Sequence, residues 1–328
     1  MRCRFCGGSL QLIEEAPRYI VRYCGKCDIY QTEPQGYSRS VFNISAYDEA
    51  WHTMARLSER RVLRSRTRLL KSLPINLRGK RLLEIGPGTG ELLKAAATLG
   101  CDVLGVDMNR ANVEYIRSRW GLPVLNGKFE ETEFDQPFDI VVMCDVIEHI
   151  EDPRTVLASI KNVLVPEGLL HLDTPNPANL FSLKSGYLVA SSFGPDHVTL
   201  FTPKSLRTML EGCGFGLLQL TTYMESTHLA SALIGAMIKG SKRLLGKTHF
   251  KADIHVTRGE LALGEGSTSC IAQELVATKH STTIYWVKLA VWALRLALGY
   301  ALTPIWLCPE RFLGPRGYLA HIRAVAQA

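Results

Sequence analysis

The chain has 328 residues, of which 46% are hydrophobic and 21% are charged, and its formal net charge is +7. This composition excludes a largely disordered protein, and the length allows one large α/β domain with additions, or two domains. The first residues are polar and include cysteine, unlike a secretory signal, so we expect a cytoplasmic protein with reduced thiols.

Residues 1–36 contain two Cys-x-x-Cys pairs, the spacing typical of a zinc ribbon. The pairs are Cys3 with Cys6 and Cys24 with Cys27. Two such turns facing each other present four thiolates tetrahedrally, and four protein ligands leave no position open for a catalytic water. We therefore predict a structural Zn²⁺ site that stabilises a small module without a core of its own. The alternative is two unrelated turns in a frayed terminus.

Residues 37–78 are expected to form a linker and then a basic helix. The positive charges of this helix are Arg56, Arg60, Arg61, Arg64, Arg66, Arg68 and Lys71, interrupted only by Glu59. One interpretation is a solvated helix face. The other is contact with an anionic surface, either phospholipid or nucleic acid.

Residues 79–223 alternate between short apolar runs and amphipathic helical patterns, which predicts a parallel sheet with helices on both faces. Strands are expected at residues 82–85, 103–106, 140–143, 169–172 and 215–222, and residues 317–328 should hold the strand that closes the sheet. The fold class is therefore α/β, with a doubly wound, mostly parallel sheet.

Residues 224–316 are expected to be an apolar helical insertion or lid before the last strand. Within it, residues 284–307 are long enough to span a bilayer, but Lys288 and Arg295 lie on one helical face. Each would cost roughly 2.5–3.5 kcal/mol at the bilayer centre. A helix lying in the membrane interface is therefore favoured, which would place the protein peripherally on the inner face of a membrane. The alternative is a lid or dimer helix packed on the protein itself.

A glycine-rich loop follows the first predicted strand of the sheet. Gly86, Gly88 and Gly90 occupy alternate positions between a strand and a helix, where glycine allows a sharp turn and close approach of a ligand. A dinucleotide loop is the rival interpretation. The third glycine comes one residue too early for that fingerprint, however, and Glu84 would repel a pyrophosphate. A carboxylate there can instead bind the ammonium of a methionine moiety.

A second acidic position follows at the end of the next strand. Asp107 can accept hydrogen bonds from both hydroxyls of a ribose, and Met108 beside it can form an apolar wall for adenine. The combination of Glu84, the glycine spacing and Asp107 separates this site from a nicotinamide-dinucleotide site. These residues predict binding of S-adenosyl-L-methionine.

These motifs, together with FDIVVMCDVIEHIEDP and LVPEGLLHLDTPN, resemble the class I S-adenosylmethionine-dependent methyltransferases. The resemblance covers residues 78–222 and is greatest to the ubiquinone-biosynthesis O-methyltransferase-like branch. It implies a Rossmann-like fold with a seven-stranded sheet. It also implies that Asp145 lies near the sulfonium. Lys128 departs from the family's usual Asp near adenine, so we expect a backbone contact from Phe129 instead. The implied cofactor residues are Glu84, Gly86, Gly88, Gly90, Asp107, Met108, Phe129 and Asp145.

Two histidines are candidates for a general base. His149 follows the fourth strand, where open α/β sheets bind ligands, with Asp145 and Glu148 nearby. His197 lies in a second loop, at a position where similar enzymes carry a histidine near the acceptor. The alternative for His149 is that it packs or caps a turn.

The sequence thus predicts O-methylation of a small or lipid-linked acceptor, such as a quinone precursor or a glycan intermediate. A zinc-ribbon RNA methyltransferase is the alternative, because the arginine-rich helix could contact phosphates. Nucleic acid is the less favoured partner, since no aromatic and basic stacking platform is present in the sequence. A methyltransferase fold kept as a non-catalytic binding module is a third interpretation, which the intact Glu84–Gly90 loop disfavours.

Overall fold

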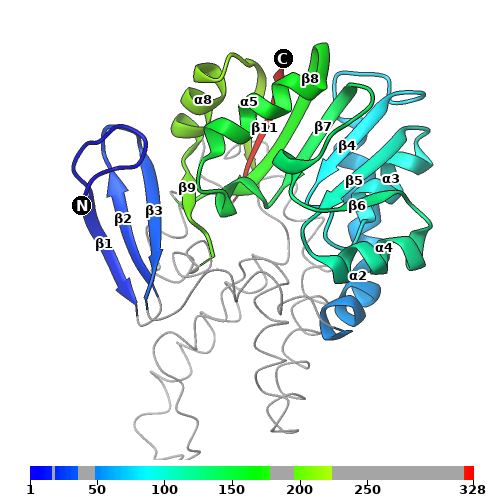
Figure 1. Ribbon diagram of the computed structural model, residues 1–328, viewed down its shortest axis with the longest axis horizontal. Helices are drawn as coiled ribbons and strands as arrows, with labels where there is room; N and C mark the ends of the chain where they lie inside the picture. Colours follow the sequence, from blue (N-terminus) through cyan, green and yellow to red (C-terminus); the bar gives the residue numbers. More distant parts are fainter. Residues whose placement is uncertain (17–18, 36–48, 178–195, 224–320) are drawn as a thin grey trace, which may run out of the picture.

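The computed structural model describes residues 1–16, 19–35, 49–177, 196–223 and 321–328, and its centre is a seven-stranded sheet (Figure 1). The strands are β4 (Arg81–Ile85), β5 (Asp102–Asp107), β6 (Val124–Asn126), β7 (Phe138–Cys144), β8 (Leu164–Pro175), β10 (Gly216–Tyr223) and β11 (His321–Gln327). Their order is β10-β11-β8-β7-β4-β5-β6. β11 runs antiparallel to both of its neighbours, and the pairs from β8 to β6 are parallel.

This topology confirms the predicted α/β class and the mostly parallel, seven-stranded methyltransferase fold. The expected strands overlap β4, β5, β7, β8 and β10, and the closing strand is β11. The sequence analysis did not place β6, because a three-residue strand is too short to show a periodic pattern.

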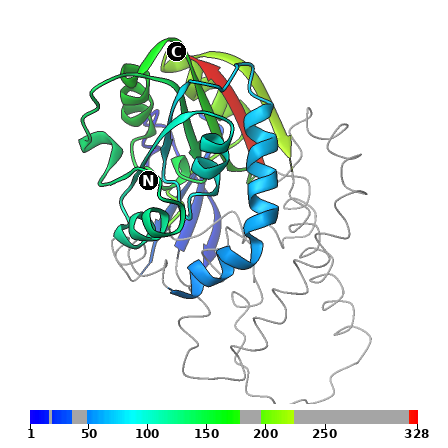
Figure 2. The same cartoon turned by 90° about the vertical axis from the view of Figure 1, so that its right-hand side faces the viewer.

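Helices pack on both faces of the sheet because alternate strand residues are apolar on each face. The helices are α2 (Glu49–Lys71), α3 (Glu91–Thr98), α4 (Arg110–Trp120), α5 (Pro153–Val163) and α8 (Pro203–Gly212). Leu83 and Val141 belong to a core with α5 and α8. Leu82 and Val142 belong to a second core with α2, α3 and α4. Figure 2 shows α2 as a long helix standing along the sheet.

Capping residues fix where three of these helices begin. The Asn109 side chain accepts from Ala111 N at the start of α4, and Asp152 accepts from Thr155 N at the start of α5. Thr202 and Ser205 form a reciprocal capping box on α8. By contrast, the N-cap of α3 is Gly90, which has no side chain that could accept from the first N–H groups of the helix.

A smaller antiparallel sheet contains the four cysteines and includes one strand from far along the chain. β1 (Gln11–Ala16), β2 (Tyr19–Cys24) and β3 (Ile29–Pro34) form a meander, and β9 (Thr199–Phe201) pairs with β3. Ile29 shares a core with α5 and α8. The N-terminal module is therefore built into the side of the larger domain (Figure 1), which its sequence did not indicate.

Several sequence predictions concern residues outside those described. They include the linker up to residue 48, the insertion at residues 224–316 and its apolar segment 284–307. Among the helices of the described ranges, none is long and apolar enough to span a membrane.

Candidate active site

The glycine loop between β4 and α3 combines tight packing with one open position. Gly86, Gly88 and Gly90 all have positive φ, at 68°, 56° and 82°. A Cβ on Gly90 would lie 2.9 Å from Ile116 Cγ1, so packing excludes a side chain there. A Cβ on Gly88 would have no atom of the described residues within 4 Å. The loop thus exposes bare backbone at Gly88, as close approach of a ligand requires.

Glu84 places a buried carboxylate directly before this loop. Its side chain accepts a hydrogen bond from the backbone N–H of Leu93, while Oε2 is buried without a hydrogen-bond partner among the described residues. Burial raises the pKa of Glu84 to about 8, and the nearby Arg66 guanidinium opposes that rise. A buried, unsatisfied acid of this kind is stabilised by a cationic ligand.

Asp107, at the end of β5, is held by the loop that it faces. Its Oδ1 accepts from Asn109 N at 2.8 Å, and its Oδ2 accepts from Asn112 Nδ2 at 3.2 Å and Gly88 N at 3.3 Å. Each carboxylate oxygen has two lone pairs, so Oδ1 keeps a free acceptor position. Burial raises the pKa of Asp107, and the hydrogen bond from Asn109 N opposes that rise.

Apolar side chains lie exposed beside Asp107. Met108 is 60% exposed and Leu125, in the edge strand β6, is 38% exposed. Met108 comes directly after β5, and Leu125 lies in the neighbouring strand β6. Exposed apolar side chains at the carboxyl end of parallel strands suit the wall of a site for a planar, apolar group. Phe129, by contrast, is buried in the core at the start of a short 3-10 helix, η2 (Phe129–Glu131).

Arg66 of α2 joins this site, which sequence reasoning missed. It acts electrostatically on Glu84, Asp145 and Asp173, whereas its neighbour Arg64 is exposed. The basic helix is therefore not wholly a solvated face, because one of its arginines turns toward buried carboxylates. A signal was present in the sequence: Arg66 is one turn before Leu69 and Leu70, which are both buried.

Asp145 adopts a left-handed backbone conformation, with φ of 54°, directly after β7. Its N–H donates to the carbonyl oxygen of Asp173 on β8 at 3.0 Å. The next residue, Val146, lies against the glycine loop, because a Cβ on Gly86 would come 2.6 Å from Val146 Cγ2. Asp145 is therefore adjacent to the glycine loop.

His149 and His197 lie together. Their rings are 4.8 Å apart in an edge-to-face arrangement. His149 ends a short 3-10 helix, η3 (Ile147–His149), and its Nδ1 lies 3.0 Å from the carbonyl oxygen of Asp196. Burial, and then the neighbouring His197, lower the pKa of His149 to about 4.

Glu148 lies beneath the two histidines. It is fully buried, its Oε2 accepts from the Thr174 hydroxyl at 2.9 Å, and its backbone carbonyl accepts from Val198 N. Burial, and then the charge of Asp145, raise the pKa of Glu148 to about 8. Ligand atoms of Glu148, His149 and His197 all lie within 4.8 Å of one another.

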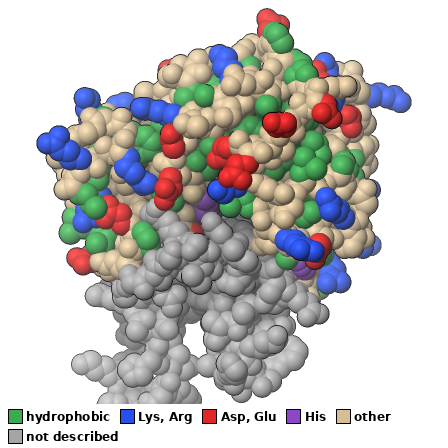
Figure 3. Space-filling view, viewed as in Figure 1, with side chains coloured by type: hydrophobic (Ala, Val, Ile, Leu, Met, Phe, Trp, Pro, Cys, Tyr) green, Lys and Arg blue, Asp and Glu red, His purple; other side chains and the backbone are tan. Residues whose placement is uncertain are grey.

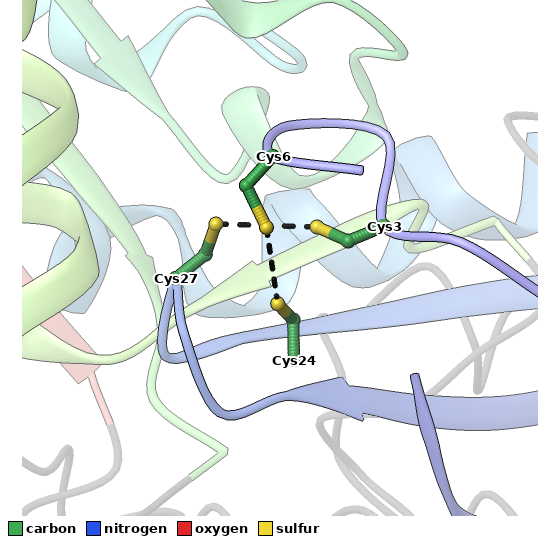
Figure 4. Close-up of side chains that lie close together, drawn as sticks. All are labelled: Cys3, Cys6, Cys24 and Cys27. Carbon is green, nitrogen blue, oxygen red and sulfur yellow. Dashed lines mark hydrogen bonds between the residues drawn. The ribbon is translucent and has the colours of Figure 1, made fainter. Parts of the chain in front are cut away.

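The four cysteines converge in the small sheet (Figure 4), with all four sulfur atoms within 4.8 Å of one another. The Sγ atoms of Cys3 and Cys27 are 4.0 Å apart, and those of Cys6 and Cys24 are 3.6 Å apart. In a tetrahedral site with Zn–S bonds of 2.3 Å, adjacent sulfurs are about 3.8 Å apart. The hydrogen bond from Gly8 N, and then that from Cys27, lower the pKa of Cys6 to about 7. The cluster thus has the geometry of a four-thiolate metal site.

A chain of polar contacts connects the cysteine cluster with the histidine pair. The Gln31 side chain donates to Cys3 Sγ at 3.1 Å and accepts from Arg4 Nε at 3.3 Å. Arg4 Nη2 donates to the carbonyl oxygen of Val198 at 2.8 Å, next to His197. On the neighbouring turn, the Thr202 hydroxyl donates to Asp28 at 2.7 Å.

Comparisons with known proteins find a methyltransferase family model and methyltransferase relatives. A family model described as a methyltransferase domain matches residues 51–220. The mitochondrial ubiquinone biosynthesis O-methyltransferase of Schizosaccharomyces pombe is 36% identical over 104 residues, covering 29% of this chain and 38% of that protein. The ubiquinone biosynthesis O-methyltransferase of Actinobacillus pleuropneumoniae serotype 5b is 30% identical over 137 residues, covering 38% of this chain and 56% of that protein.

Solved structures of similar chains include the cyclopropane synthase MmaA2 from Mycobacterium tuberculosis. It is 16% identical, with a TM-score of 0.47, and the match covers 80% of this chain and 83% of that one. The chain spans less than two thirds of the length of the two curated relatives above.

The family model covers more than half of the chain and includes the loop, Asp107 and Asp145. The chain therefore belongs to the methyltransferase domain family, and it carries a class I S-adenosylmethionine-dependent methyltransferase domain.

Proposed function

We propose that this chain binds S-adenosyl-L-methionine between Glu84, the loop Gly86–Gly90 and Asp107, and transfers its methyl group to a hydroxyl oxygen. Two observations carry this proposal. Oε2 of Glu84 is buried and has no hydrogen-bond partner among the described residues, and the backbone of Gly88 in the loop that follows is open to a ligand. The ammonium of the methionine moiety would satisfy that oxygen. Asp107 would hold the ribose, and Met108 would pack on adenine, with Phe129 contributing backbone only.

The chain's own residues would align the two reactants and move one proton. S-adenosylmethionine supplies an activated methyl group on a sulfonium, and its transfer is an in-line displacement. Asp145 lies at the reacting end because Val146 packs against Gly86. His149 and His197 are proposed to face the acceptor, and the sequence makes each of them a candidate for the base.

Calorimetry with S-adenosylhomocysteine tests the cofactor site. Asp107→Asn should weaken binding by about tenfold, since it removes the charge that accepts the ribose hydroxyls. Asp102→Asn, an exposed acid at the other end of the same strand, should bind like the unchanged chain. Equal affinity in Asp107→Asn would contradict the ribose assignment.

The acid–base roles have a separate test. His149→Gln and His197→Gln should each bind S-adenosylhomocysteine normally but turn over more slowly. If both keep full turnover, neither histidine is the base.

We also propose that Cys3, Cys6, Cys24 and Cys27 hold a structural Zn²⁺. The support is the pair of sulfur separations, 4.0 Å and 3.6 Å, which bracket the value for tetrahedral zinc. The four cysteines form no disulfide. Such an ion would fix the two turns and, through β3, the pairing with β9.

The acceptor is proposed to be small or lipid-linked, such as a quinone precursor or a glycan intermediate. The ubiquinone biosynthesis O-methyltransferase activity of the two curated relatives supports a hydroxyl acceptor of the quinone type. The apolar residues 284–307 support a peripheral membrane contact from sequence alone. Flotation with anionic phosphatidylglycerol vesicles should recover the full chain, and deletion of residues 284–307 should abolish recovery. Failure of the full chain to float would remove the membrane proposal.

An RNA acceptor is the second candidate, favoured by one observation. Arg56, Arg60, Arg64 and Arg68 recur every four residues on α2, and all are exposed. Such a stripe can contact successive phosphates. Against it, acidic and basic side chains are interspersed over the described face in Figure 3. Binding to ribosomal RNA that falls steeply with salt would favour this candidate over the first.

A further inference from the structure

A polar cluster lies where β8 and β11 meet, beyond the groups assigned above. His321 is the first residue of β11 and pairs with Pro175, the last residue of β8. Its Nδ1 lies 3.5 Å from Asp173 Oδ1 and 3.8 Å from Asp145 Oδ1. The cluster therefore joins a histidine to two carboxylates at the carboxyl end of the parallel strands, where α/β sheets bind ligands.

Asp173 is fixed by contacts on its other oxygen. The Tyr223 hydroxyl donates to Asp173 Oδ2 at 2.6 Å, and Arg323 Nη2 lies 3.6 Å from the same atom. Asp173 is 1% exposed. Although burial acts to raise the pKa of Asp173, its contacts with His321, Arg323 and Tyr223 hold it well below its ordinary value. Asp173 is thus a buried anion, and Oδ1 is the oxygen that faces His321.

The cluster adjoins the glycine loop through a continuous set of contacts. Asp145 N donates to Asp173 O, and the next residue, Val146, packs against Gly86. The Asp145 side chain is 37% exposed and that of His321 is 16% exposed, compared with 2% for Asp173. The buried side of the cluster is Asp173, and its accessible side is the one next to the loop.

We infer that His321 is the group that takes the proton from the acceptor hydroxyl, with Asp173 as its positioning residue. This inference rests on the proposed transfer of a methyl group to oxygen. Two carboxylates at Nδ1 favour the tautomer with the proton on Nδ1, so Nε2 carries the lone pair that accepts a proton. Sequence reasoning could not nominate His321, because Asp173 lies 148 positions earlier in the chain.

The step balances as a displacement coupled to proton transfer. The hydroxyl O–H bond breaks, and its proton goes to His321 Nε2. The oxygen lone pair forms the new bond to the methyl carbon, and the C–S bond breaks with its electron pair left on sulfur. The imidazolium then returns its proton to water.

The surroundings of His321 suit this role better than those of His149. Among the described residues, the charged or titratable groups that face the cluster are Asp145 after β7, Cys144 on β7, His171 and Asp173 on β8, Tyr223 on β10, Arg323 on β11 and Arg66 on α2. Two carboxylates lie within 4 Å of His321 Nδ1 and stabilise an imidazolium, whereas His149 has the single carboxylate of Asp196 at 3.9 Å and also faces a second histidine.

Histidine titration by NMR tests the inference without requiring the acceptor. The chain has 9 histidines, so the His321 signal is assigned by its loss in His321→Gln. Its titration midpoint should be lower with bound S-adenosylmethionine, whose sulfonium is positive, than with S-adenosylhomocysteine, whose sulfur is neutral. A unit charge at a distance of several ångströms predicts a difference of about half a pH unit or more.

An equal midpoint in the two complexes overturns the inference, since His321 would then not adjoin the sulfonium. If neither ligand binds, the proposed function fails and the inference fails with it. If both bind and the shift is present but no hydroxyl is methylated, the cofactor site stands, and both the oxygen acceptor and the base role of His321 are wrong.

Turnover with a dihydroxybenzoate probe gives the second measurement. His321→Gln should bind S-adenosylhomocysteine normally, but its kcat should be about 100-fold lower. The fall in kcat at acid pH that the unchanged chain shows should also be absent in this variant. Asp173→Asn should lower kcat by a smaller factor than His321→Gln does. Asp173→Glu should recover part of the kcat lost in Asp173→Asn, as a positioning role requires. Gln327→Ala, at the far end of β11, serves as the control. Full kcat in His321→Gln would overturn the inference.

Discussion

At the scale of single residues, burial decides the chemistry of the acids in this molecule. Glu84 and Glu148 are both buried, and burial is the largest cause of the rise in pKa to about 8 for each. Asp173 is as deeply buried, but its cationic and hydroxyl partners keep it ionised. In the sequence, Glu84, Glu148 and Asp173 are simply three acidic residues. Only their partners in the fold show which of them is held as an anion, as Asp173 is, and which is left with a raised pKa.

Glu84→Gln should change stability and ligand binding in opposite directions. The folded-state pKa of Glu84, about 8, exceeds its ordinary value of 4.5. The stability it contributes is therefore fully present below pH 4.5 and is lost as pH rises through 8. In the ligand-free protein, Glu84→Gln should raise the Tm at pH 8 by a few degrees, while S-adenosylhomocysteine should bind about tenfold more weakly or worse.

Thermal unfolding from pH 5 to 9 and calorimetry measure these two effects. Glu114→Gln, an exposed acid of α4, should change neither. A lower Tm for Glu84→Gln at pH 8 would show that Glu84 is satisfied within the ligand-free fold.

At the scale of elements, α2 both packs into the core and brings one arginine close to the buried acids, and its composition alone does not show which residues do which. Its leucines Leu69 and Leu70 pack into the core, and Arg66 turns toward the buried acids, while Arg64 remains in solvent. Sequence pattern gave the helix and its charge. Only packing against the sheet decided which arginine faces inward.

Arg66→Met should weaken S-adenosylhomocysteine binding by about tenfold, because Glu84 and Asp145 lose a nearby positive charge. Arg64→Met removes the same charge two residues away on the exposed face and should leave affinity unchanged. Calorimetry on both variants at one ionic strength makes the comparison. Equal effects would mean that the helix acts through its net charge alone.

The pairing of β3 with β9 connects the cysteine cluster to the larger domain. Cys27→Ser should therefore lose about one equivalent of zinc by elemental analysis and also destabilise β9. Amide hydrogen exchange at residues 199–201 should become faster, and the Tm should fall. Cys213→Ser, at the end of α8, should retain its zinc, and hydrogen exchange in β9 should stay as slow as in the unchanged chain. Unchanged exchange in β9 after zinc loss would show that the small sheet is independent of the metal.

At the scale of the whole molecule, the sheet brings distant segments to one edge. β11 lies between β8 and β10, so His321 reaches Asp173, and β9 brings His197 beside the small sheet. The proposed acceptor side thus draws on residues near 145, 173, 197 and 321, whereas the proposed cofactor side lies within residues 84–145. This difference in span explains why the sequence could suggest residues for the cofactor more readily than for the acceptor.

The sequence by itself determined the α/β class, the glycine loop, its flanking acids and the four-cysteine spacing. Each of these depends on residues within a few tens of positions, where periodicity and motif spacing carry the information. The tertiary structure decided that β9 completes the small sheet, that Arg66 faces Glu84, and that His321 contacts Asp173. Those contacts join residues from 18 to 172 positions apart, and they depend on the packing of both faces of the sheet, which local sequence patterns do not specify.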